Sequence, residues 1–246
     1  MDIAQHKARL RTYFDGIGFQ RWSAIYGEEE LSRVRRTIRD GHRAMLARAC
    51  TWLDADRLPA QAAVLDAGCG TGLFSLELAR RGYRVTAADI AEQMVSATAE
   101  RLLAADLRDQ VHCVVSDLEA LDGTYDLVAC FDVLIHYPAQ AFGTMLQHLA
   151  ARSSDRLLFT YAPHSPLLAL LHRIGGFFPH SQRRTDIQMV PDETVRSALT
   201  QAGMAINAMQ RVNSGFYHVT LIEARRITSA KGVQPGARLG SSLNDS

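Results

Sequence analysis

The strongest constraint on the fold is an alternation of short apolar runs with helical stretches, which begins near residue 59. The runs have the length and composition of buried strands, and the stretches between them have the spacing of helices. Strands separated by helices must cross over to pair, so the alternation indicates a parallel sheet. The expected strands are AAVLDAG, YRVTAADI, VHCVVSD, YDLVACFDVL and RLLFTYAP. We therefore expect a doubly wound α/β domain, in which ligands gather at the carboxyl ends of the strands.

An arm precedes this domain, and we assign it to residues 1–58. Apolar residues between 31 and 52 recur in steps of three, four or seven, which predicts a helix over 28–53 with one apolar side. The segment before this helix is rich in aromatic residues but contains Gly16, Gly18 and Gly27. Glycines at this density indicate short helical pieces joined by turns.

The α/β domain is expected to span residues 59–228 and to contain an insertion. Residues 163–190 interrupt the alternation with leucines, a Gly-Gly pair, two phenylalanines and a basic stretch, which suits a lid. A helix over 192–202, with Asp192 as a plausible N-cap, then precedes two strand-like runs, MAINAMQRV and FYHVTLIEARR. These runs are close enough to form an antiparallel pair. The polar, Gly- and Ser-rich residues 229–246 are expected to be disordered.

Composition excludes several classes of protein. The 246 residues carry a net charge of only +1, which disfavours broad nucleic-acid binding. No apolar run approaches the roughly 18 residues of a spanning helix, and the first residues lack a signal-peptide core, so we expect a cytoplasmic protein. The cysteines form no CxxC pair, which predicts reduced, buried thiols rather than disulfides or a zinc site: Cys50, Cys69, Cys113 and Cys130.

A glycine-rich turn follows the first expected strand. The strand ends in Asp66, and glycine then occupies every second position: Gly68, Gly70 and Gly72. Glycines turn sharply and let the backbone approach a ligand, because they have no Cβ. The dinucleotide motif GxGxxG needs another spacing, since Thr71 and Leu73 stand where glycine or alanine would be required. A pyrophosphate cofactor is therefore unexpected.

Two further acids follow the next two strands. Asp89 ends the second strand, where a carboxylate can accept hydrogen bonds from both ribose hydroxyls, and Asp117 ends the third. A single strand-end acid can equally well cap a helix or shape a loop. Three acids in register with the glycine turn favour a nucleotide site instead.

This pattern resembles the S-adenosylmethionine sites of class I methyltransferases. The resemblance implies that the glycine turn lies against the methionine moiety, that Asp89 holds the ribose, and that Asp117 and Leu118 meet the adenine. Ile90 and Phe131 complete the expected cofactor-binding set. The resemblance to class I methyltransferases further implies a Rossmann-like seven-stranded sheet, in which the final hairpin supplies strands six and seven.

The sequence of the arm points to one family among the class I methyltransferases. The segments YFDGIGFQRW (13–22), IYGE (25–28) and IRDGH (38–42) resemble the magnesium-protoporphyrin O-methyltransferases of chlorophyll and bacteriochlorophyll synthesis, and the likeness extends over about residues 11–226. The implied reaction transfers a methyl group to one propionate of magnesium-protoporphyrin IX. A propionate is already ionised at neutral pH, so this chemistry needs no general base. In-line placement and exclusion of water are the main tasks.

Two side chains are expected to orient the propionate as hydrogen-bond donors. His136 follows the fourth strand, at the edge where the methyl group should lie, and Tyr26 lies in the arm. The resemblance points to both. Without it, His136 can simply be satisfied by backbone, and Tyr26 can be a core aromatic.

The basic helix, the lid and its histidines can each be interpreted in more than one way. A helix face with several arginines can meet the second propionate, although a solvated face is the better interpretation: Arg33, Arg35, Arg36, Arg39 and Arg43. The same two readings apply to Arg183 and Arg184 in the lid. The lid leucines and phenylalanines suit either a cover over the porphyrin or peripheral contact with a membrane. We assign no metal ligand to His164, His172 or His180, because hard magnesium prefers oxygen, so magnesium enters only within the substrate.

Competing functions remain. The chain can be a methyltransferase for another hydrophobic acid or for a phenol, and a phenol would need a base. It can also be a non-catalytic protein that binds S-adenosylmethionine or the porphyrin. Hand-over of the porphyrin from magnesium chelatase is implied by the pathway alone.

Overall fold

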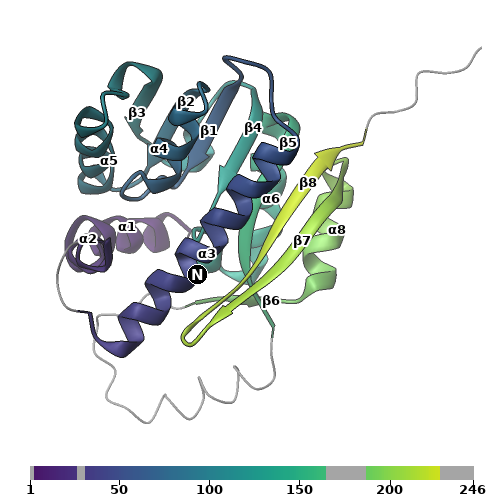
Figure 1. The fold of residues 1–246 in the computed structure, drawn as a ribbon. Helices are drawn as coiled ribbons and strands as arrows, with labels where there is room; N and C mark the ends of the chain where they lie inside the picture. Colours follow the sequence, from purple (N-terminus) through teal and green to yellow (C-terminus); the bar gives the residue numbers. More distant parts are fainter. Residues whose placement is uncertain (1–2, 27–30, 165–186, 228–246) are drawn as a thin grey trace, which may run out of the picture.

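The described part of this computed structural model comprises residues 3–26, 31–164 and 187–227 (Figure 1). All five expected parallel strands are present. They run side by side with the final hairpin in the order β3-β2-β1-β4-β5-β8-β7, which confirms the doubly wound α/β sheet. The strands are β1 (Ala63–Ala67), β2 (Arg84–Asp89), β3 (Val111–Val115), β4 (Tyr125–Cys130), β5 (Ser153–Pro163), β7 (Met204–Ser214) and β8 (Tyr217–Arg226).

The two last strands pair antiparallel, as expected, and β8 also pairs antiparallel with β5. An eighth strand, β6 (Met189–Val190), was not expected, because its two residues lie at the end of the predicted lid. It pairs with Ala162 and Pro163 of β5. Most of the predicted lid, residues 165–186, and the whole predicted tail, residues 229–246, lie outside the described residues.

Helices cover both faces of the sheet. One face carries α3 (Arg33–Ala55), α4 (Leu73–Arg80) and α5 (Glu92–Ala104), and the other carries α6 (Ala139–Arg152) and α8 (Asp192–Gln201). Each face has its own apolar core, one built on α6 and α8 and the other on the inner sides of α3, α4 and α5. Short 3-10 turns lie in three connections: η2 (Arg108–Gln110), η3 (Leu118–Ala120) and η4 (Leu134–His136).

The predicted start of α3 and the predicted N-cap of α8 were wrong, although α8 begins at Asp192 as expected. Helix α3 begins after Ser32, whose side chain accepts a hydrogen bond from the backbone N–H of Arg35 at 3.3 Å. Asp192 is not an N-cap, because Pro191 occupies that position. Its carboxylate instead accepts from the Tyr161 hydroxyl at 2.8 Å and from Arg211 at 3.1 Å, so it ties α8 to two strands.

The arm is helical, as expected. It comprises α1 (Ile3–Tyr13), a π-helical turn η1 (Phe14–Gly18) and α2 (Phe19–Tyr26). The pieces meet at Gly16, whose φ of −126° and ψ of −111° are not helical, whereas Gly18 continues the helix. Figure 1 shows α1 and α2 lying beneath α5 and beside α3.

Helix α3 lies very close to the β7–β8 hairpin. A Cβ on Gly41 would lie only 2.5 Å from Cδ1 of Tyr217, so this position accepts no side chain without a shift of the helix or the strand. Nearer the hairpin tip, the backbone N–H of Phe216 donates to the hydroxyl of Thr37 at 3.2 Å.

The four cysteines are free thiols. Cys69 and Cys130 are buried as expected, but Cys50 and Cys113 are only half-buried. Burial raises the pKa of Cys50 to about 11, so this thiol is protonated at neutral pH.

Candidate functional site

A cavity of about 1060 Å³, counted with the open space at its mouth, lies at the carboxyl ends of β1, β2, β3 and β4. Helices α1, α2 and α3 supply the wall opposite these strand ends, and η1, α4 and α5 also contribute to the lining. Ten of the predicted site residues line it together: Tyr26, Asp66, Gly68, Gly70, Asp89, Ile90, Asp117, Leu118, Phe131 and His136. Gly72 does not line the cavity. It precedes α4 with a φ of +78°, and a Cβ there would lie 2.8 Å from the side chain of Thr98 on α5, so glycine at this position lets α4 begin close to α5.

The glycine turn presents backbone to the cavity. Gly68 has a φ of +83°, and a Cβ there would collide with Val133. Gly70 has a φ of +54°, yet no described atom lies within 4 Å of where its Cβ would be. Because Gly70 lines the cavity, this open space is part of the cavity, and a side chain at position 70 would fill it.

A buried carboxylate, Asp66, and a half-buried one, Asp89, flank this turn. Asp66 is 3% exposed and accepts from the hydroxyl of Ser75 at 2.5 Å. Asp89 accepts from the backbone N–H of Gly70 and from that of Ala91, each at 3.0 Å. Burial raises the pKa of each carboxyl to about 6, so both are ionised at neutral pH. A carboxylate has about four acceptor positions, so Asp89 keeps some for a ligand.

The arm touches the loops that follow three different strands. His6 Nε2 lies 2.7 Å from the carbonyl oxygen of His136 after β4, and Lys7 pairs with Asp117 after β3 at 2.8 Å. Arg11 donates to the carbonyl oxygen of Ile90 after β2 at 3.2 Å. Asp15 accepts from the N–H of Gln93 at 3.2 Å. Sequence reasoning found the arm but not these contacts.

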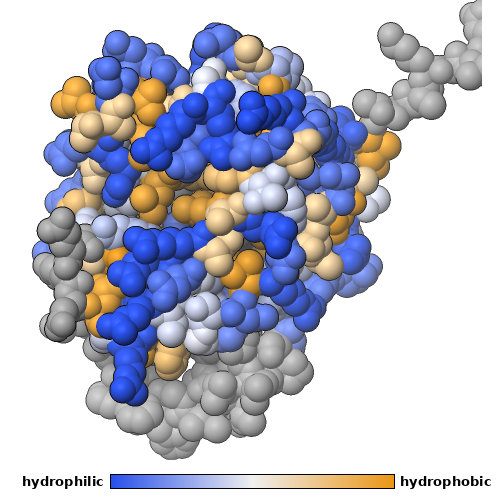
Figure 2. All heavy atoms as spheres, in the orientation of Figure 1, coloured by the Kyte–Doolittle hydropathy of each residue, from blue (hydrophilic) through white to orange (hydrophobic). Residues whose placement is uncertain are grey.

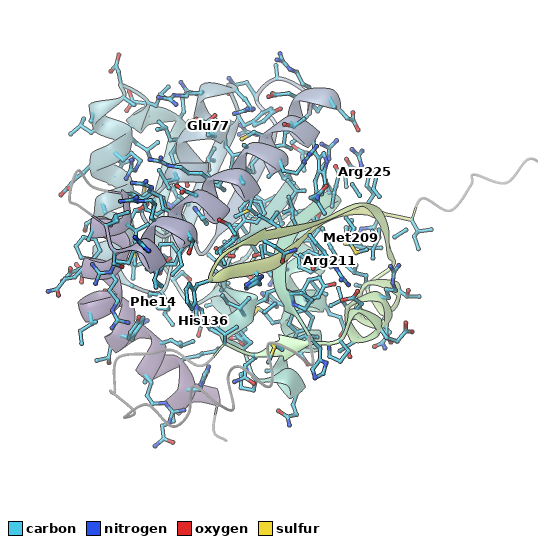
Figure 3. All side chains as sticks on the ribbon, turned by 60° about the horizontal axis from the view of Figure 1, so that its bottom comes forward. Phe14, Glu77, His136, Met209, Arg211 and Arg225 are labelled. Atoms are coloured by element: carbon cyan, nitrogen blue, oxygen red, sulfur yellow. The ribbon has the colours of Figure 1, made fainter. Side chains whose placement is uncertain are left out.

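His136 lies where arm and sheet edge meet (Figure 3). Its ring lies edge-on to Phe14, with 5.4 Å between centroids. Among the described residues, its buried Nδ1 has no hydrogen-bond partner. Burial, with a smaller contribution from His6, lowers the pKa of His136 to about 4, so the ring is neutral at neutral pH.

Tyr26 belongs to a network that sequence reasoning missed. Its hydroxyl is hydrogen-bonded to Nδ1 of His42 on α3, and its ring stacks on Trp22 at 6.0 Å between centroids. Nε2 of His42 faces a carboxylate oxygen of Asp132 at 3.9 Å. The only earlier signal was that His42 ends the IRDGH segment and Asp132 follows Phe131.

Comparison with known proteins places the chain in a family. The family described as "Magnesium-protoporphyrin IX methyltransferase C-terminus" matches residues 130–226. The Magnesium-protoporphyrin O-methyltransferase of Synechocystis is 36% identical over 89% of this chain and 96% of that protein. That of Rhodobacter capsulatus is 34% identical over 91% and 98%. The chain belongs to the magnesium-protoporphyrin O-methyltransferase family.

Other matches agree with this membership. The chloroplastic relative from Arabidopsis thaliana is 40% identical over 89% of this chain and 70% of that protein. A crystal structure of the Synechocystis methyltransferase with bound S-adenosylhomocysteine (SAH) superposes with a TM-score of 0.82 and 36% identity, over 89% of this chain and 99% of that one. A general "Methyltransferase domain" matches residues 64–153. The predicted family, class I fold and methyl donor are confirmed.

The arginines and lid residues that were considered for porphyrin binding do not line the cavity or are not described by the structure. The α3 arginines do not line the cavity, and Figure 2 shows the visible side of α3 as mostly hydrophilic, which agrees with a solvated face. His172, His180, Arg183 and Arg184 lie outside the described residues. Within the described ranges, no three His, Cys, Asp or Glu side chains are grouped for a metal ion, and no helix is long and apolar enough to cross a membrane.

Proposed function

We propose that this chain transfers the methyl group of S-adenosylmethionine to one propionate of magnesium-protoporphyrin IX, forming the monomethyl ester. One observation carries the proposal. The glycine turn and strand-end acids lie in the same cavity as His136 and Tyr26, so a donor and an acceptor can meet there. Membership of the magnesium-protoporphyrin O-methyltransferase family supplies the acceptor.

The donor end of the cavity fits S-adenosylmethionine. The backbone of Gly68 and Gly70 faces the methionine part beside Asp66, and the open Cβ space at Gly70 is the cradle for it. Asp89 accepts from the ribose hydroxyls. Ile90, Asp117, Leu118 and Phe131 surround the adenine. When bound, the donor supplies an electrophilic methyl group on a positively charged sulfur.

The acceptor end positions a carboxylate. The unpartnered Nδ1 of His136 and the hydroxyl of Tyr26 hold its oxygens. No base is required, because the propionate is ionised. The reaction cancels two opposite charges, so the arm favours it by excluding water from the cavity. Phe14 and Trp22 supply apolar cover on that side.

The test is incubation with methyl-labelled S-adenosylmethionine and magnesium-protoporphyrin IX, followed by chromatography of the labelled porphyrin. Metal-free protoporphyrin, the dimethyl ester of magnesium-protoporphyrin and simple phenols serve as controls. We expect label only in the monomethyl ester of the magnesium porphyrin. Binding without transfer would indicate a non-catalytic role.

A phenol methyltransferase is the second candidate. The neutral His136, whose pKa of about 4 leaves it free to accept a proton, is the observation that favours it. Labelled phenol in the wild type, and none in His136→Asn, would replace the porphyrin assignment.

A cytoplasmic location, peripheral contact with a membrane and hand-over from magnesium chelatase are further parts of the proposal. The exposed arginines of α3 and the 70% exposed Phe216 at the hairpin tip support membrane contact, since cationic and aromatic side chains suit an anionic lipid surface. Co-sedimentation with anionic but not neutral vesicles tests the contact. Faster ester formation with chelatase present than with free porphyrin tests the hand-over.

A further inference from the structure

Five elements build the network behind Tyr26. Asp132 follows β4 with a φ of +58°, in a left-handed conformation that is unusual for aspartate. Its carboxylate accepts from the hydroxyl of Thr160 on β5 at 3.0 Å and from that of Tyr217 on β8 at 2.9 Å. The backbone N–H of Asp132 donates to the same Thr160 oxygen at 2.7 Å. The carboxylate is therefore held in place by Thr160 and Tyr217, independently of His42.

This anchor decides which nitrogen of His42 carries the proton. Nε2 faces the Asp132 carboxylate at 3.9 Å, and a lone pair directed at an anion is unfavourable. The neutral ring therefore carries its proton on Nε2, and Nδ1 is an acceptor. Because Nδ1 accepts, the Tyr26 hydroxyl must donate to it. In this state Tyr26 has no proton left to donate to a carboxylate in the cavity.

A second proton on His42 reverses the hydrogen bond. Imidazolium donates from both nitrogens, so Nε2 still faces Asp132 while Nδ1 now donates to the Tyr26 oxygen. The tyrosine proton is then free for the acceptor. We propose that His42 positions the Tyr26 hydroxyl for the acceptor carboxylate, and that binding of this carboxylate brings one proton from solvent onto His42. The inference rests on the proposed function. Once methylation removes the charge of the carboxylate, the proton returns to solvent, so the reaction needs no other reagent.

The surroundings of His42 allow this coupling. Burial lowers the pKa of His42, and the Asp132 charge opposes that shift. Trp22 of α2 lies 5.8 Å from the His42 ring and Tyr217 of β8 lies 6.3 Å from it, between centroids. A propionate beside Tyr26 adds a second negative charge to that of Asp132, and both favour the imidazolium.

Two cations also act on Tyr26. Arg43 of α3 and Arg101 of α5 both lower the pKa of its hydroxyl, but burial and Asp132 outweigh them and raise it overall. Tyr26 therefore stays protonated, and the only change is the direction in which its proton points.

The experiment measures binding of magnesium-protoporphyrin IX to the full chain saturated with S-adenosylhomocysteine, by porphyrin fluorescence from pH 7 to 9. Uptake of one proton makes the dissociation constant rise with pH by up to about tenfold per unit. We expect this slope in the wild type. His42→Asn should bind without the slope, because an amide near the Nδ1 position donates without taking up a proton.

Three controls isolate the coupling. His218→Asn makes the same change at a half-buried position of β8 outside the cavity lining and should keep the wild-type slope. Tyr26→Phe should lose the slope, since no hydroxyl remains to be turned. The dimethyl ester of the porphyrin lacks a carboxylate and should bind the wild type with no slope. Loss of packing alone would change stability but would leave the slope in place.

The outcomes separate the inference from the proposed function. If the wild type methylates the porphyrin but binds it with no pH dependence, or if His42→Asn keeps the wild-type slope, proton coupling at His42 is wrong and the function stands. If the wild type neither binds nor methylates magnesium-protoporphyrin, the function itself is wrong.

Discussion

Asp89 combines two tasks in one side chain. Backbone N–H groups of Gly70 and Ala91 hold its oxygens, so it shapes the glycine turn, and its remaining acceptor positions face the cavity. Its pKa of about 6 lies closer to neutrality than that of an exposed aspartate. The strength of its contact with a ribose should therefore depend on pH.

Asp89→Ala is expected to weaken binding of S-adenosylmethionine by about 1.5–3 kcal/mol at pH 7.5, the range for hydrogen bonds to a charged group. In the wild type, affinity should fall as pH is lowered through about 6, because the protonated carboxyl accepts less well. The variant should lose most of that pH dependence. Calorimetric titration measures both effects. Asp109→Ala, on the exposed turn η2, is the control, and an unchanged affinity in folded Asp89→Ala would remove Asp89 from the site.

Gly70→Val is expected to abolish donor binding while the fold survives, because the side chain would fill the cradle. Gly82→Val is the matched control for Gly70→Val. Gly82 also has a positive φ, of +78°, and an open Cβ position, but it does not line the cavity. Both variants should lose similar stability, of about 1–3 kcal/mol, from backbone strain. Thermal melts with and without S-adenosylhomocysteine should show ligand stabilisation in Gly82→Val only. Equal stabilisation in both would mean that the turn does not contact the donor.

His136→Asn is expected to keep measurable turnover, reduced by about 10- to 100-fold, because an amide still donates to the propionate. The variant should also have a nearly flat pH profile for kcat from 6.5 to 9, since the residue that it replaces has a pKa of about 4 and does not titrate there. Turnover at background level with both affinities intact would make His136 a base and the acceptor a hydroxyl.

The cavity brings together the strand-end acids that the sequence singled out, whereas the network of His42 was not predicted. Asp66, Asp89 and Asp117 could be found because each ends a strand, and parallel strands end at one edge. His42, Asp132 and Tyr217 could not be paired in advance, since their contact depends on how α3 packs against the hairpin. Gly72 followed the motif spacing, but it serves the packing of α4 against α5.

At the scale of elements, the part of the arm before α3 contacts the rest of the protein through polar and aromatic side chains, outside the two apolar cores. Both apolar cores begin at α3 or later in the chain, and no residue of α1 or α2 belongs to either. The contacts of His6, Lys7, Arg11 and Asp15 instead reach the loops around the cavity.

Deleting residues 1–27 is therefore expected to leave a cooperative unfolding transition but to abolish methyl transfer, because the cavity loses one wall and becomes open to water. Differential scanning calorimetry and the labelled-methyl assay measure the two effects. Methyl transfer at the wild-type rate would contradict the role of the arm as a cover.

The presence of the strands and helices could be predicted from the periodicity of apolar residues, but the residues at which they begin and end could not. Alternating apolar runs were enough to place β1 to β5, because burial dictates those runs. The start of α3 was set by the Ser32 cap, and β6 by pairing with the end of β5, which local sequence does not encode.

At the scale of the molecule, a buried ion cluster connects the end of α3 with strands β5, β8 and β7. Arg156 of β5 is 1% exposed and donates to the carbonyl oxygen of Asp56, just after α3, at 2.8 Å. Its Nε lies 3.2 Å from Glu223 of β8, which also pairs with Arg225 and accepts from Asn207 of β7 at 2.6 Å.

Arg156→Met is expected to lower the free energy of unfolding by about 2–4 kcal/mol. Removing one member of a buried pair typically costs about 3–5 kcal/mol, and here Arg225 and Asn207 still compensate part of the Glu223 charge. Urea denaturation measures the change. Arg80→Met breaks the exposed pair with Glu77, in which Arg80 is 56% exposed, and should cost less than about 1 kcal/mol. Equal costs would mean that the buried cluster adds no stability.

The contact between Gly41 and Tyr217 has a consequence for how such chains diverge. A methyl group at position 41 and an aromatic ring at position 217 exclude each other, and the ring carries the hydroxyl that holds Asp132. A side chain at position 41 is therefore tolerated only with a smaller residue at position 217. The two positions, 176 residues apart along the chain, should therefore covary among homologues as a single inherited unit.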